Sequence, residues 1–148
     1  MRKYIITPAL LAIVCMVMCH CTFNRKASVA ANEYLIQGEL ANLPDSIVIG
    51  LYEEDGNILN CVLRDTLMNG QFSFRDTVST TRKMLIMSDN RGFPGTWLEV
   101  WIAPGEYIEI KGQDKLVKTW EVVSDVPEQQ EEIAAGIVPD YDRYITSF

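Results

Sequence analysis

Apolar and polar positions alternate with a period of two over most of the chain beyond residue 32. Ile36 and Gly38 alternate with Gln37 and Glu39, and residues 71–75 place two phenylalanines between polar neighbours. Successive side chains of a strand point to opposite faces, so this pattern predicts strands with one buried face and one face in water. Further segments of strand character lie at 46–52, 58–66, 83–87, 97–102, 106–110 and around 118–123.

Turn-forming pairs separate these segments. Asp55-Gly56 lies between two of them, and Asn69-Gly70 precedes residues 71–75. Ala103-Pro104-Gly105 joins segment 97–102 to segment 106–110. Such pairs favour tight hairpins, so they predict antiparallel neighbours along the chain.

Seven or eight short strands with no helical pattern between them predict an all-β fold, either an antiparallel β-sandwich or a partly open barrel. The composition changes after Val126-Pro127, where Glu, Gln and Ala favour a helix. We therefore expect an antiparallel β-domain over 33–124 and a C-terminal helical segment over 125–148, with a second short helix at 141–148.

The N-terminus has the features of an export signal. Arg2 and Lys3 precede an apolar run over 5–18 that ends next to Cys19 and Cys21. We expect residues 1–21 to be a signal peptide of the lipoprotein type and 22–32 to be a linker. Cys19 and Cys21 are the candidate lipidation sites, although Met18 and His20 stand where a small residue is usual. Ordinary cleavage near 28–31 and an uncleaved anchor are the alternatives. Lipidation would tether the protein to a membrane of the cell envelope, on its periplasmic side or at the cell surface.

Composition argues against several classes of function. The net charge is -7, and Lys and Arg do not cluster, which argues against nucleic acid as a partner. The only histidine is His20, so nucleophiles activated by histidine and histidine-containing zinc sites are not expected in the β-domain. Glu99 and Glu109 on neighbouring segments form only a weak carboxylate pair. We expect no enzyme activity and no cofactor.

Cys61 is the one thiol of the β-domain. Its apolar neighbours predict a buried and slowly reacting side chain.

Trp97 and Trp101 share one strand face, beside a loop that contains Arg91 and Phe93. These four residues are the candidate contact surface, because exposed aromatic faces stack on sugars and peptides. The alternative is that the two tryptophans lie in the core or beneath the C-terminal helix.

The order of several elements resembles that of a known β-domain of unknown function. The matching elements are Tyr34-x-Ile36-x-Gly38, Arg64-Asp65-Thr66 leading into Asn69-Gly70-Gln71-Phe72-Ser73-Phe74, Ile102-Ala103-Pro104-Gly105, and a Val-Ser segment before a Gln/Glu-rich helix. That domain stands at the N-terminus of thioredoxin-like thiol-disulfide oxidoreductase lipoproteins of the TlpA/ResA and AhpC/TSA type. The resemblance spans roughly 33–132.

In that family, a thioredoxin domain with a Trp-Cys-x-x-Cys site follows the β-domain. Here Arg64 stands where a second cysteine would follow Cys61, so no redox residue carries over. The resemblance implies a non-catalytic envelope lipoprotein domain that contacts an envelope protein or a ligand. The alternatives are a truncated or split half of an oxidoreductase, and a surface lipoprotein that binds carbohydrate or peptide.

Replacing both Cys19 and Cys21 by Ser tests the export assignment. We expect the double variant to leave the membrane fraction or to accumulate as precursor, whereas Cys15→Ser does neither. Fractionation and precursor size measure this, and a double variant that is still processed and membrane-bound contradicts lipidation.

Overall fold

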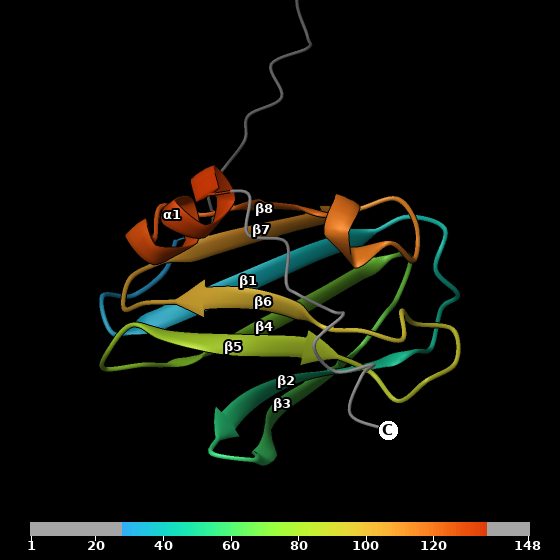
Figure 1. Cartoon of the computed structure of the whole chain (residues 1–148), viewed down its shortest axis with the longest axis horizontal. Coiled ribbons are helices and arrows are strands. Elements are labelled where there is room, and N and C mark those ends of the chain that lie inside the picture. The colour runs from blue at the N-terminus through green and yellow to red at the C-terminus, as the bar shows by residue number, and fades with distance from the viewer. Residues whose placement is uncertain (1–27, 136–148) are drawn as a thin grey trace, which may run out of the picture.

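The computed structural model describes residues 28–135, whose eight strands form two sheets stacked face to face (Figure 1). Sheet A has the order β4 (Gln71–Thr77), β1 (Glu33–Leu40), β7 (Tyr107–Gly112), β8 (Glu121–Val123). Sheet B has the order β3 (Ile58–Thr66), β2 (Val48–Asp55), β5 (Arg82–Met87), β6 (Leu98–Ile102). A 3-10 turn, η3 (Val117–Thr119), precedes β8, and helix α1 (Pro127–Ala135) follows it. The all-β sandwich with a short C-terminal helix is thus confirmed, while Cys19, Cys21 and the segment 141–148 lie outside the described residues.

The core fills the space between the sheets. Ile36 on β1 and Ile108 on β7 point into it from sheet A, and Ile49 and Val100 point into it from sheet B, all four fully buried. Along β6 the burial alternates strictly, as the period of two predicts. Burial of these aliphatic and aromatic side chains is the main stabilising contribution to the fold.

Strand β1 pairs with a neighbour on each edge. It runs antiparallel to β4 and parallel to β7, with Ile36 opposite Phe74 on one side and Ile108 on the other. The expectation of a purely antiparallel domain is therefore wrong for this pair. A parallel pair needs a long crossover, and here the intervening chain forms β2 and β3 in sheet B, β4 in sheet A, and β5 and β6 in sheet B.

The two hairpin signals have different outcomes. Gly56 takes a positive φ of 64° in a two-residue loop, and β2 and β3 pair as predicted. Asn69 and Gly70 also take positive φ angles, 52° and 75°, in a tight turn closed by hydrogen bonds between Met68 and Gln71. That turn nevertheless carries the chain from β3 in sheet B to β4 in sheet A, and Leu67 just before it is buried in the core. The predicted hairpin between residues 58–66 and 71–75 is therefore wrong.

A glycine lets an aromatic ring fill the core of sheet A. Gly38 on β1 faces Phe72 on β4, and a Cβ atom placed on Gly38 would lie 1.9 Å from the Phe72 ring. Gly112 makes the same room for Trp120, whose indole would lie 2.6 Å from a Cβ atom there. Both glycines are needed for packing space, since neither has a positive φ.

Gly38→Ala therefore overpacks a buried ring. We expect it to lower the free energy of unfolding by about 1–3 kcal/mol. Gly95→Ala is the matched control, because no atom lies within 4 Å of a Cβ built there, and we expect a change of no more than about 0.5 kcal/mol. Urea denaturation measures both, and equal midpoints for the two variants would show that Phe72 does not need the space.

Candidate functional site

The predicted tryptophan face lies outside the core, but part of it is covered. Leu98, Val100 and Ile102 point into the sandwich, which leaves Trp101 on the outer face of sheet B. There the Lys83 ammonium lies 5.3 Å from the centre of the Trp101 ring.

Helix α1 completes this cover. The side-chain oxygen of Gln129 accepts a hydrogen bond from the Trp101 backbone N–H at 2.9 Å. Lys83 is held by Glu99 at 2.9 Å and by Glu132 of the helix at 2.7 Å. Partial burial lowers the pKa of Lys83, but its hydrogen bonds to Glu132 and Glu99 outweigh this and raise it, so the ammonium stays charged over Trp101. Trp101 is therefore half-buried, with Lys83 over its ring and α1 bonded to its backbone.

The other three residues of the predicted contact surface do not form one exposed surface. Phe93 is 4% exposed and packs edge-on against Trp120 at 5.7 Å, so its assignment to a contact surface is wrong. The sequence could not show that its loop folds back over the core. Arg91 is exposed on the same loop, and Trp97 is half-buried beside a hollow of about 260 Å³ that it lines with Leu59 and Leu85.

Cys61 is exposed, which makes the prediction of a buried thiol wrong. It lies on the outer strand of the β2–β3 hairpin, which projects away from the sandwich at the bottom of Figure 1. Apolar neighbours in sequence do not bury Cys61, because it lies opposite Tyr52, which points to the outer face of sheet B while its neighbour Leu51 enters the core. The Arg64 Nε–H donates a hydrogen bond to the Cys61 sulfur at 3.3 Å. Burial raises the pKa of the nearby Tyr52 hydroxyl, and the Cys61 sulfur raises it further.

Strand β3 is a long edge strand that bears exposed apolar side chains. Ile58 is 63% exposed, Leu59 43% and Val62 42%. The pairing with β2 shifts register, since Leu51 faces Leu63 and Tyr52 faces Cys61. Val62 is thus the extra residue of a β-bulge.

The other three sheet edges are short, capped or covered. On β4, the Ser73 N–H donates to the Asp65 carboxylate at 2.7 Å. On β6, the Gln129 side chain occupies the Trp101 N–H. Strand β8 has three residues, whereas β3 has nine. Within residues 28–135, no comparable cap or cover lies on the apolar stretch of β3. Exposed strand edges invite pairing with another chain, so this edge is a candidate contact site.

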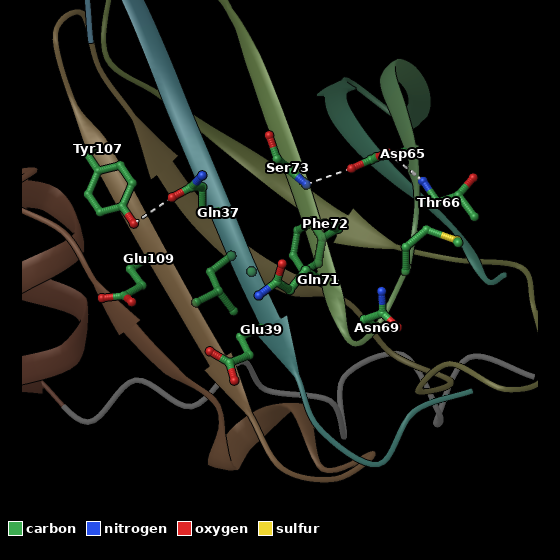
Figure 2. A pocket seen from close by; sticks show the side chains of 13 residues that line it. Gln37, Glu39, Asp65, Thr66, Asn69, Gln71, Phe72, Ser73, Tyr107 and Glu109 are labelled. Atoms are coloured by element: carbon green, nitrogen blue, oxygen red, sulfur yellow. Dashed lines mark hydrogen bonds between the residues drawn. The ribbon is translucent and has the colours of Figure 1, made fainter. Parts of the chain in front are cut away.

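A second candidate site is a hollow of about 570 Å³ on the outer face of sheet A (Figure 2). The strand register places its polar side chains in two rows across the strands. Ser73, Gln37 and Glu109 form one row, and Gln71 and Glu39 lie in the next. Neighbouring strands are about 4.8 Å apart, so one molecule can contact a whole row.

Two residues close the sides of this hollow. Asp65 comes from the end of β3, and its carboxylate accepts hydrogen bonds from the backbone of Thr66 at 2.8 Å and of Ser73. On the opposite side, the Tyr107 hydroxyl donates to the Gln37 side-chain oxygen at 3.0 Å. Partial burial and the neighbouring Glu109 raise the pKa of Tyr107, so its hydroxyl stays protonated at neutral pH.

The remaining chemistry is sparse. Among residues 28–135, no cluster of His, Cys, Asp and Glu has the geometry to hold a metal ion. Glu99 and Glu109 belong to different sheets and both face outward, so they lie on opposite sides of the sandwich and form no pair. No helix in the described part of the chain is long and apolar enough to cross a membrane.

No protein-family model, curated protein or solved structure matches the chain.

Sequence reasoning missed both candidate sites. Polar residues alternate along residues 37–39, 71–73 and 107–109, which is the signal for the wet faces that form the hollow. Nothing local in the sequence shows that these three segments are neighbours, because the β1–β7 pair joins strands far apart in the chain.

Exposure of Cys61 predicts rapid reaction with thiol reagents in the native state. We expect a maleimide to modify the native protein nearly as fast as the urea-unfolded one, since access and not unfolding limits the reaction. Arg64→Ala removes the hydrogen bond to the sulfur and separates its effect from that of exposure. Protection of the native thiol by a hundredfold or more would restore the buried assignment.

Proposed function

We propose that this protein is a non-catalytic domain of the cell envelope that binds another protein by strand addition to β3. One observation carries the proposal: β3 is a nine-residue edge strand with large exposed apolar side chains. The exported and lipid-anchored state rests on the sequence of residues 1–21.

Strand addition suits this edge for two reasons. An incoming extended segment would satisfy the backbone groups of β3 that point away from β2, and its side chains would cover Ile58, Leu59 and Val62. Because the β2–β3 hairpin projects from the sandwich, a partner strand can approach it without meeting sheet A (Figure 1).

The bulge at Val62 limits where pairing occurs. A bulge interrupts the ladder and twists the strand, so the regular edge available to a partner is the segment 58–61 next to the hairpin loop, with the exposed Val62 side chain at its inner end. The paired segment is therefore short, and binding depends on a few residues, as in a reversible contact.

The surface around Trp101 is a weaker candidate for the contact site than β3. Trp101 is only half-buried, but Lys83 already lies over its ring and α1 is bonded to its backbone, which leaves less of the ring for stacking. The function is accordingly assigned to β3.

Photo-crosslinking in intact cells tests this function. A photoreactive amino acid in place of Leu59 should give one discrete adduct with an envelope protein. Val62→Lys should abolish that adduct, because a charge at an edge discourages strand pairing, while stability changes by no more than about 0.5 kcal/mol since Val62 faces no residue on β2.

Thr80→Lys is the matched control, because Thr80 is also exposed but lies on the β4–β5 connection. The control should retain the adduct. Loss of the adduct in both variants, its persistence in both, or no adduct from position 59 contradicts strand addition at β3.

A further inference from the structure

The hollow on the outer face of sheet A has the lining of a polar binding site. Its volume of about 570 Å³ falls within the range usual for small-molecule sites, about 300–1,000 Å³. Amide, hydroxyl and carboxylate side chains supply most of the surface, with the Tyr107 ring at one side. Apolar ligands need a mostly apolar lining, so this hollow suits a molecule rich in hydrogen-bonding groups.

The charges in the hollow argue against an anionic ligand. No Arg, Lys or His lines it. Three carboxylates do, from Glu39, Asp65 and Glu109. A phosphate, sulfate or carboxylate would therefore meet repulsion without a compensating cation.

The same charges also argue against a strongly cationic ligand. Both oxygens of Asp65 accept backbone hydrogen bonds, and Glu109 pairs with Lys111 at 3.0 Å. Among the described residues, Glu39 is then the lining carboxylate that neither caps a backbone group nor forms an ion pair. The backbone hydrogen bonds stabilise the Asp65 carboxylate without neutralising it, but they occupy both of its oxygens, so Glu39 is the carboxylate left to contact a ligand. One such carboxylate among many neutral dipoles fits a neutral ligand better than a polybasic peptide.

The hydrogen-bonding groups are both donors and acceptors. The Tyr107 hydroxyl fixes the Gln37 side-chain oxygen and so directs the Gln37 amide N–H groups away from it. Toward the rest of the described chain, the side-chain amides of Asn69 and Gln71 make no hydrogen bond. A hydroxyl group donates and accepts at once, so a surface of amides and carboxylates matches adjacent hydroxyls on a sugar ring. The Tyr107 ring adds an apolar edge against which C–H groups can pack.

A neighbouring hollow extends the site across the sheet. It has a volume of about 550 Å³, shares Glu39 with the first, and continues over Lys111 toward Glu121 of β8. Its lysine, Lys111, is already paired with Glu109, and Asp114 and Glu121 add two carboxylates, so this extension does not favour an anionic ligand either. Together the two hollows cross all four strands of sheet A, which is longer than one sugar ring requires.

From these observations we infer that the outer face of sheet A binds a neutral oligosaccharide that lies across strands β4, β1 and β7. Gln37, Glu39 and Gln71 hydrogen-bond its hydroxyls, and Tyr107 contacts a ring edge. Of β3 this site uses only Asp65 and Thr66 at the end of the strand, away from the segment 58–61, so binding of a saccharide and of a protein strand are independent functions.

Titration of the full chain in detergent tests the inference. The probes are maltohexaose, cellohexaose, xylohexaose, mannohexaose and chitohexaose, with hexagalacturonate and hexalysine as charged comparisons. We expect saturable binding of at least one neutral probe by calorimetry. We also expect the combined change Glu39→Ala and Gln71→Ala to weaken it at least about tenfold, as for the loss of two hydrogen-bonding side chains.

Both replaced side chains are exposed, so the double variant should keep its fold and its denaturation midpoint. Glu131→Ala on the exposed side of α1 is the matched control and should bind like the parent. The inference is overturned if no neutral probe binds at millimolar concentration, if hexalysine or hexagalacturonate binds in their place, or if the double variant binds as tightly as the control. Val62→Lys should leave saccharide binding unchanged, so failure of the saccharide proposal can be told from failure of the β3 proposal.

Discussion

Strand β1 is hydrogen-bonded on both edges, and the rest of the sandwich depends on this. It pairs antiparallel with β4 and parallel with β7 while its Ile36 side chain enters the core. A parallel pair needs a crossover, and between β1 and β7 the chain visits sheet B twice, with β4 in sheet A between the two visits, so each sheet contains strands from both halves of the domain. Gly38 on the same strand makes room for the Phe72 ring of β4, which packs against β1 on the core side of the sheet.

This arrangement decides which surfaces are left for function. With β1 in the interior of sheet A, polar residues from three separate segments meet on one outer face and form the hollow around Gln37. In sheet B, α1 covers the β6 edge through Gln129, whereas the projecting β3 edge keeps its apolar side chains exposed. The two proposals thus use different surfaces, one polar and concave, the other an open strand edge.

The sequence predicts the strands well because alternation is a local property. The faces of β6 follow from it directly, and Gly56 marks the β2–β3 hairpin. Alternation does not identify the partner of a strand, which is why the β1–β7 pair and the sheet change at Asn69-Gly70 were not predicted. Burial of a single residue also depends on which face of its strand it occupies, and Cys61 is exposed because it lies with Tyr52 on the outer face of sheet B.

Amide hydrogen exchange of the purified protein tests most directly whether β1 is the doubly paired centre and β3 the open edge. Backbone amides of β1 should exchange slowest, while the β3 amides that point away from β2 should exchange within the rate expected for exposed groups. If those β3 amides were as protected as the amides of β1, the edge would already be covered, and strand addition there would be contradicted.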